Sequence, residues 1–360
     1  MPSLKCHNRC KDAARAVLGR LGRARRSLPW GSLQWIIQPR PSSVNFTRHF
    51  NMWILALIGL AILWTPDLDW ASLEAQYLRD PKDIDRVGDV RWHVRDEGAP
   101  HEGVIVLIHG FASDLQTWNA WASVLQTRYR VIRFDLPGYA LSGPVAGGDY
   151  RSAAQCQRIE ALLRSRGVDP KASSVPVIWA GHSMGAGLAT QCAASSAHPP
   201  HGLILVAPAL TAATSGSSTD EDRARATGSW SQALKWILPK QLVRQGLTSA
   251  HAAERPPSDD EVDRSYAMLR APGVRQAILE SAAHRGAAVD QGARFQGPVL
   301  VLWGDQERLL RPGVLAKVQE AFPQAQVRRY PQAGHMVHED AAEASLADVR
   351  AFLREKLGSY

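Results

Sequence analysis

Four residues of this sequence could carry out nucleophilic chemistry together. Ser183 is the centre of the G-x-S-x-G pattern GHSMG, and His335 follows an Ala-Gly pair near the C-terminus. A serine hydroxyl is a weak nucleophile at neutral pH and needs a base, usually a histidine whose imidazole is oriented by a carboxylate. Two carboxylates, Asp305 and Glu307, stand two positions apart in WGDQE. The set predicts attack by serine on an acyl-type bond.

The elements around these residues predict how they would be positioned. Ser183 follows the apolar run 175–180 and precedes the Ala-rich helical segment 184–196, so it lies on a strand-to-helix turn whose glycines permit a sharp bend. His335 comes soon after the strand-like segment 326–330. It would therefore lie at the carboxyl edge of a sheet, where ligands bind in such folds.

Short apolar runs alternate with helical segments from residue 88 onward. Near-continuous apolar runs are typical of strands covered on both faces, whereas residues 91–95 alternate like an antiparallel edge strand. Residues 209–296 contain no convincing strand and predict a helical insertion. The fold class is therefore α/β, a mostly parallel doubly wound sheet with a helical insertion. Strands are expected at 103–108, 129–134, 175–180, 203–206, 298–303 and 326–330, and helices at 116–126, 150–166, 184–196 and 346–357.

Residues 88–360 resemble the α/β-hydrolase superfamily, in particular its capped serine hydrolases of the AB hydrolase-1 type. The segments that carry this resemblance occur in the family's order: VIVLIHGF at 104–111, DLPGYALS at 135–142, GHSMG at 181–185, WGDQE at 303–307 and AGH at 333–335. The resemblance implies a hydrolase core over 88–208 and 297–360 and a helical cap over 209–296.

The resemblance also implies the roles of individual residues. Ser183 is the expected nucleophile and His335 the base, and the backbone amides of Phe111 and Met184 form the expected oxyanion hole. Laid on the family pattern, Glu307 takes the acid position, while Asp305 falls at a variable position and remains the alternative, with a turn-capping role otherwise. No metal and no organic cofactor is implied.

Other residues are expected to support the site rather than to react. His109 should shape its loop, His182 should pack behind the turn, and His338, one helical turn after His335, is expected on the surface. Ala140 replaces the second glycine of the family's D-x-x-G-x-G-x-S turn.

The expected activity is hydrolysis of an ester or similar bond in an apolar small molecule, through an acyl-enzyme. Carbon-carbon bond hydrolysis of ring-cleavage products with the same triad is an alternative, as is a non-catalytic binding protein of this fold. Nucleic acid is not an expected partner, because the basic residues are concentrated in 1–50. That segment carries a net charge of +9, which leaves −1 for the rest of the chain out of a total of +8.

The N-terminal region predicts a membrane location. Residues 1–50 read as a basic, disordered tail, and residues 51–66 as a membrane anchor or signal core, since Met52 to Trp64 contains no charged residue. Because basic residues favour the cytoplasmic side, the hydrolase part is expected on the non-cytoplasmic side, in the periplasm of a bacterium. The four cysteines show neither a disulfide framework nor paired metal-binding motifs.

Overall fold

The computed structural model describes residues 63–210, 232–283 and 295–357. These residues form an eight-stranded sheet with the order β1-β2-β4-β3-β5-β6-β7-β8. The first two strands pair antiparallel, and β3 to β8 are mutually parallel. The predicted fold class is confirmed. The strands are β1 (Ile84–Val87), β2 (Val90–Glu97), β3 (Val104–Ile108), β4 (Arg130–Phe134), β5 (Val177–His182), β6 (Gly202–Val206), β7 (Val299–Gly304) and β8 (Gln326–Tyr330).

Helices cover both faces of the sheet, as the apolar strands require. One core cluster joins the sheet to α5 (Ser152–Ser165), α6 (Met184–Ser195) and α13 (Val314–Ala321). A second cluster joins it to α4 (Asn119–Leu125), α14 (Val337–Asp340) and α15 (Ala342–Leu357). Strands β3, β5, β6 and β7 are buried along their whole length because they lie between these two layers.

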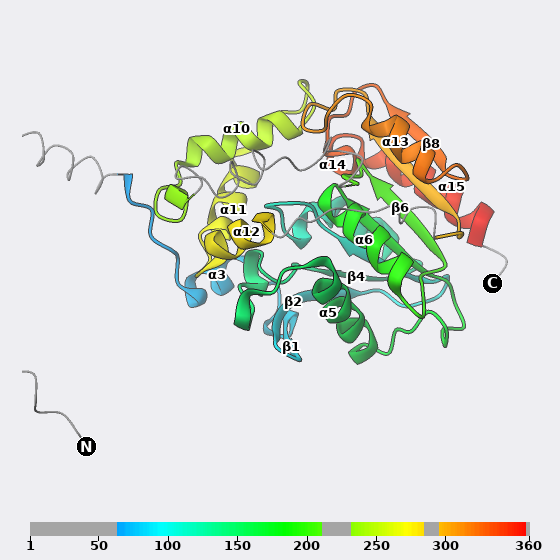
Figure 1. Cartoon of the computed structure of the whole chain (residues 1–360), viewed down its shortest axis with the longest axis horizontal. Coiled ribbons are helices and arrows are strands. Elements are labelled where there is room, and N and C mark those ends of the chain that lie inside the picture. The colour runs from blue at the N-terminus through cyan, green and yellow to red at the C-terminus, as the bar shows by residue number, and fades with distance from the viewer. Residues whose placement is uncertain (1–62, 211–231, 284–294, 358–360) are drawn as a thin grey trace, which may run out of the picture. The chain divides into compact units, whose positions relative to one another are not determined.

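Three further helices lie between β6 and β7 in the sequence: α10 (Lys240–Ala250), α11 (Asp259–Leu269) and α12 (Val274–Ala283). This count covers only residues 232–283 of that interval, which the structure describes, and these three are referred to below as the cap helices. Figure 1 shows them grouped together, with α3 (Trp70–Tyr77) nearby and α10 extending toward α14. Ser258 begins α11 with a capping box, in which its side chain and that of Glu261 satisfy each other's backbone N–H groups.

The structure corrects the predicted location. No helix within the described ranges is long and apolar enough to cross a membrane. This finding overturns the expectation of an anchored protein with its hydrolase part on the non-cytoplasmic side. Residues 1–50 and most of the predicted anchor at 51–66 lie outside the described residues, and of its last four residues only Leu63 is helical.

A disulfide bond is a second correction. Cys156 of α5 is bonded to Cys192 of α6, with 5.2 Å between the two Cα atoms. No sequence pattern indicated this pair, because 36 positions separate the two cysteines. Only the packing of α5 beside α6 brings them together.

Candidate active site

Ser183 occupies the sharp turn between β5 and α6. Its backbone has φ +51° and ψ −117°, a conformation that is rare for a residue with a side chain. The turn is held by its own peptide groups, because the Ser183 N–H donates to the Val206 carbonyl at 2.9 Å, and the Ser183 carbonyl accepts from Ala186 and Ala209. Surrounding contacts thus maintain a strained conformation, an arrangement that is frequent at reactive residues.

The two glycines of GHSMG are required by close backbone packing. A Cβ atom at Gly181 would lie 2.6 Å from the Cα atom of Ala186, and one at Gly185 would overlap the carbonyl groups of Ile108 and His109. Neither position has room for a side chain. The approach of Gly185 to the end of β3 also brings the start of α6 against the loop that carries His109.

His335 and Glu307 form a buried hydrogen-bonded pair. His335 Nδ1 donates to Glu307 Oε2 at 2.5 Å, and each side chain is only 5% exposed. Burial raises the pKa of Glu307, but the hydrogen bond and charge of His335, together with the backbone N–H groups of Leu309 and Leu310, lower it by more, so the pKa lies below its ordinary value. Because an ionised carboxylate can only accept, Nδ1 carries a proton, and Nε2 is the ring nitrogen that faces away from Glu307.

Asp305 lies outside this pair. Its carboxylate accepts from Nε of Arg329 at 2.7 Å, and its backbone N–H donates to the carbonyl of Tyr330. The turn-capping role expected for Asp305 falls to Glu307 instead, whose Oε1 accepts from the N–H groups of Leu309 and Leu310. Of the two carboxylates that the sequence left open, the structure brings only Glu307 to His335.

The loop after β3 lies beside Ser183. A Cβ atom added to Gly110 would come within 3.3 Å of the Ser183 Cβ, so the backbone that leads into Phe111 approaches the serine closely. Met184 is the first residue of α6, where backbone N–H groups are not used within the helix. The phenyl ring of Phe111 is 43% exposed and packs edge-on against Tyr139.

His109 shapes this loop. Its Nδ1 donates to the carbonyl of Gly110 at 2.7 Å, and its Nε2 accepts from the N–H of Leu136. Burial lowers the pKa of His109, which keeps the ring neutral for both bonds. The adjoining turn contains Ala140 at φ +41°, so it keeps a glycine-like conformation without the glycine.

Two further histidines lie behind His335. The ring of His182 packs against the rings of both His335 and His338, with centroids 4.7 and 4.6 Å apart, and its Nε2 donates to the His335 carbonyl. His338 is fully buried, so the expected surface position is wrong. The helical spacing that predicted exposure could not reveal Trp118, whose ring packs on His338 from a distant part of the chain. Burial lowers the pKa of His182 and His338 well below the usual value, and each pKa falls further through neighbouring imidazoles.

Asp340 supports the His335 loop and was not anticipated. Its buried carboxylate accepts from the N–H groups of Gly334 and Ala252, and from His251 Nδ1. The N–H of His335 itself donates to the carbonyl of Ala250 at 2.7 Å. The end of α10 is therefore fastened to the loop that holds His335. The only local signal in the sequence was the acidic pair Glu339-Asp340 soon after the histidine.

The family model for the alpha/beta hydrolase fold matches residues 103–342. The chain belongs to the alpha/beta hydrolase family. It is 25% identical over 256 residues to Lipase 1 of Psychrobacter immobilis, a match that covers 69% of this chain and 76% of the lipase. It is 31% identical over 259 residues to the dihydrolipoyllysine-residue acetyltransferase component of the acetoin cleaving system of Pseudomonas putida, which covers 70% of this chain and 63% of that protein.

The solved structure of a thermophilic esterase from Thermogutta terrifontis is similar to this hydrolase with a TM-score of 0.64 and 21% identity, over 76% of this chain and 99% of the esterase. These comparisons confirm the predicted resemblance. The protein is a hydrolase of the alpha/beta fold, and lipases are among its relatives. Its lipase relatives support hydrolysis of a small-molecule ester and do not favour the carbon-carbon hydrolase or the non-catalytic binding protein.

Proposed function

We propose that this alpha/beta hydrolase is a serine esterase that works through an acyl-enzyme, with Ser183 as nucleophile, His335 as base and Glu307 as the acid that orients the imidazole. The observation that carries the proposal is the 2.5 Å bond from His335 Nδ1 to a buried carboxylate. It fixes the tautomer that a general base needs. The strained turn at Ser183 provides the other half of the arrangement.

The reaction would proceed in two halves. Ser183 Oγ attacks the ester carbonyl carbon as His335 Nε2 takes the hydroxyl proton, and the resulting imidazolium is stabilised by the Glu307 carboxylate. The oxyanion of the tetrahedral intermediate accepts hydrogen bonds from the amides of Phe111 and Met184. His335 then protonates the departing alcohol. Water, deprotonated by the same imidazole, hydrolyses the acyl-enzyme and regenerates Ser183.

The neighbourhood of Ser183 favours an ester with an apolar acyl or alcohol group. Phe111, which follows the glycine that approaches Ser183, is 43% exposed, and Tyr139 contacts both its ring and the sulfur of Met184. An aliphatic chain that covers Phe111 removes apolar area from water, at about 25 cal/mol per Å². In this proposal the cap helices close over that surface.

Covalent labelling tests the proposal directly. A fluorophosphonate probe phosphonylates an activated serine, so the full-length protein should be labelled and the Ser183→Ala variant should not. Ser123→Ala provides a matched control, because Ser123 lies exposed on α4 and bonds only to its own helix. Labelling that survives in Ser183→Ala would refute the nucleophile. Hydrolysis rates of p-nitrophenyl esters with acyl chains of increasing length would then test the preference for apolar groups.

A further inference from the structure

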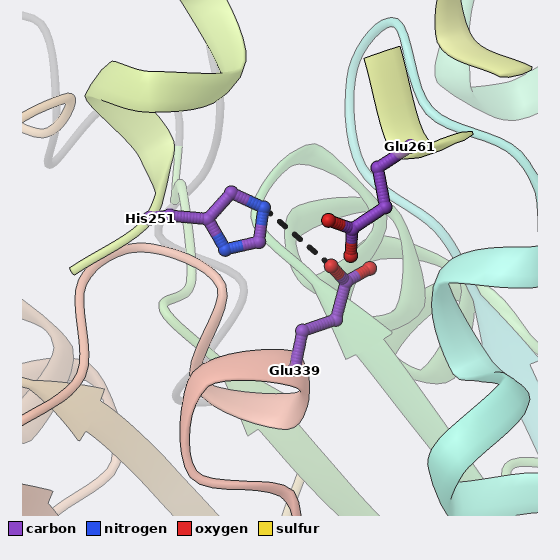
Figure 2. Close-up of side chains that lie close together, drawn as sticks. All are labelled: His251, Glu261 and Glu339. Atoms are coloured by element: carbon purple, nitrogen blue, oxygen red, sulfur yellow. Dashed lines mark ion pairs between the residues drawn. The ribbon is translucent and has the colours of Figure 1, made fainter. Parts of the chain in front are cut away.

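Behind the active site, three side chains from separate elements converge on one point. Figure 2 shows His251, Glu261 and Glu339, which come from the end of α10, the first turn of α11 and helix α14. One ligand atom from each residue lies within 4.8 Å of the others. His251 Nε2 and Glu339 Oε2 are 3.6 Å apart. The chemistry proposed for Ser183 and His335 makes no use of these three residues.

We propose that His251, Glu261 and Glu339 bind a divalent cation of the zinc class, which fastens the cap helices to the helix that follows His335. One imidazole and two carboxylates form a ligand set that suits zinc, whereas calcium takes six to eight oxygen ligands. Zinc bonds of about 2.0–2.1 Å in a tetrahedron place neighbouring ligand atoms roughly 3.3 Å apart. The 3.6 Å between His251 and Glu339 is close to that spacing.

His251 and Glu339 form hydrogen bonds to further side chains, as metal-binding residues usually do. His251 Nδ1 lies 2.6 Å from Asp340 Oδ1 and 2.7 Å from Nη1 of Arg255. Once the guanidinium turns away, the carboxylate of Asp340 holds the proton on Nδ1 and directs the Nε2 lone pair toward Glu339. Glu339 Oε1 accepts from the hydroxyl of Thr117, while its Oε2 faces His251. Two electron-rich atoms that face each other at this distance are stabilised by a positive charge between them.

The charged side chains around these three residues carry an excess of negative charge that a doubly charged cation would neutralise. Carboxylates outnumber guanidinium groups by two: Asp114, Glu261, Glu339 and Asp340 stand against Arg255 and Arg264. With a neutral His251 these groups sum to −2, and Arg308, whose Nη2 donates to the His251 carbonyl, adds one positive charge. The sum is again −2, which one divalent cation would cancel, when Arg255 leaves the cluster. A buried excess of negative charge is costly unless it is paired or coordinates a metal.

Arg255 is the competitor for this position. Its Nη2 donates to Glu261 Oε1 at 2.8 Å, and its Nη1 lies 3.8 Å from Glu339 Oε2. The side chain is 37% exposed, so the guanidinium can turn outward into water when an ion takes its place. The ion and the guanidinium are thus alternative partners of the same carboxylates, and removal of Arg255 should strengthen metal binding.

Binding of zinc to the full-length chain tests the inference, with Cys6 and Cys10 replaced by serine in every protein compared so that their thiols bind no ion. The unaltered site should bind one equivalent, measured by calorimetry and by metal analysis after dialysis. His251→Gln and Glu261→Gln should weaken binding at least tenfold. Gln at position 261 preserves the capping box, so that variant should keep its fold. Glu343→Gln, an exposed carboxylate on α15, is the matched control.

Arg255→Gln separates the two possible occupants. If the site binds metal, this variant should bind zinc about tenfold more tightly than the unaltered site, and zinc at about 100 times its dissociation constant should raise the melting temperature by roughly 5 °C. No gain in zinc affinity, together with a lower melting temperature, would mean that the guanidinium is the permanent cation and would overturn the proposal. Equal zinc binding by the unaltered site and His251→Gln would overturn it as well. These readouts do not depend on hydrolysis, so failure of the proposed esterase function would leave them unchanged.

Discussion

The two carboxylate oxygens of Glu307 accept hydrogen bonds from different donors. Oε2 accepts from His335 while Oε1 accepts from the backbone at Leu309 and Leu310, so the side chain cannot rotate without losing a bond. A glutamine at this position must turn its NH₂ group either toward His335 or toward two N–H donors. In both orientations a donor meets a donor, and the negative charge that stabilises the imidazolium is lost.

Glu307→Gln should therefore lower kcat by about 10⁴-fold, the loss seen when the acid of such a triad is neutralised. Asp305→Asn should stay within about twofold of the unaltered enzyme, because Asp305 bonds to Arg329 and not to His335. Steady-state hydrolysis of a p-nitrophenyl ester measures both variants. A larger loss at Asp305 than at Glu307 would contradict the assignment of the acid.

The lowered pKa of Glu307 also predicts how stability depends on pH. The pKa is below its ordinary value of 4.5 in the folded protein because the interaction with His335 and the backbone N–H groups of Leu309 and Leu310 together outweigh burial. The stabilisation is therefore fully present above the unfolded pKa and is lost as pH falls through the folded one. Urea unfolding at pH 7, 5, 4 and 3 should show a stability advantage over Glu307→Gln that is constant down to about pH 5 and then shrinks. A stability difference between the two proteins that increases as the pH falls would contradict this prediction.

At the scale of elements, the disulfide joins the helix that begins at Ser183 to its neighbour. Cys192 is the ninth of the 12 residues of α6, and Cys156 is the fifth of the 14 residues of α5. Both side chains are buried against the sheet. The bond therefore limits movement of α6, whose first residues form the turn around the serine.

In the loop-entropy description, a crosslink across 36 residues raises the free energy of the unfolded chain by about 4 kcal/mol at 25 °C. The Cys156→Ala/Cys192→Ala double variant should be less stable by up to this amount, seen as a lower urea midpoint. Reduced wild-type protein provides the control, because it keeps both side chains and lacks only the bond. Equal midpoints for oxidised and reduced protein would show that the crosslink does not contribute.

On the scale of the whole molecule, the sequence predicted most of what depends on local patterns. Continuous apolar runs located β3 to β7, and the resemblance to the hydrolase family favoured Glu307 over Asp305 as the acid. The sequence missed features that depend on distant contacts. Strand β1 is short and only partly buried, so it carries no clear pattern. The burial of His338, the disulfide and the bond from His335 to Ala250 arise only when separate segments pack together.

A segment ahead of the sheet shows the same dependence on distant contacts. Residues 65–67 run beside the cap helices, where the N–H of Thr65 donates to the carbonyl of Trp236, and Asp67 Oδ2 accepts from the N–H of Gly273. Arg275 of α12, only 8% exposed, donates through Nη2 to the Thr65 carbonyl and to Asp67 Oδ1 at 2.7 and 2.6 Å. The segment thus supplies the partners of a buried guanidinium group in the cap.

Asp67→Ala should consequently loosen the cap by leaving the Arg275 charge partly unpaired, since removal of one partner of a buried pair costs more than the pair contributes. Asp67 is 40% exposed, so solvent screens the pair and the expected loss is about 1–2 kcal/mol. Arg275→Met in the same protein should recover most of it, because the methionine fills the space without a charge to satisfy. Urea unfolding of the two single variants and the double variant gives the coupling energy. Losses that simply add would show that Asp67 and Arg275 act independently and would contradict this prediction.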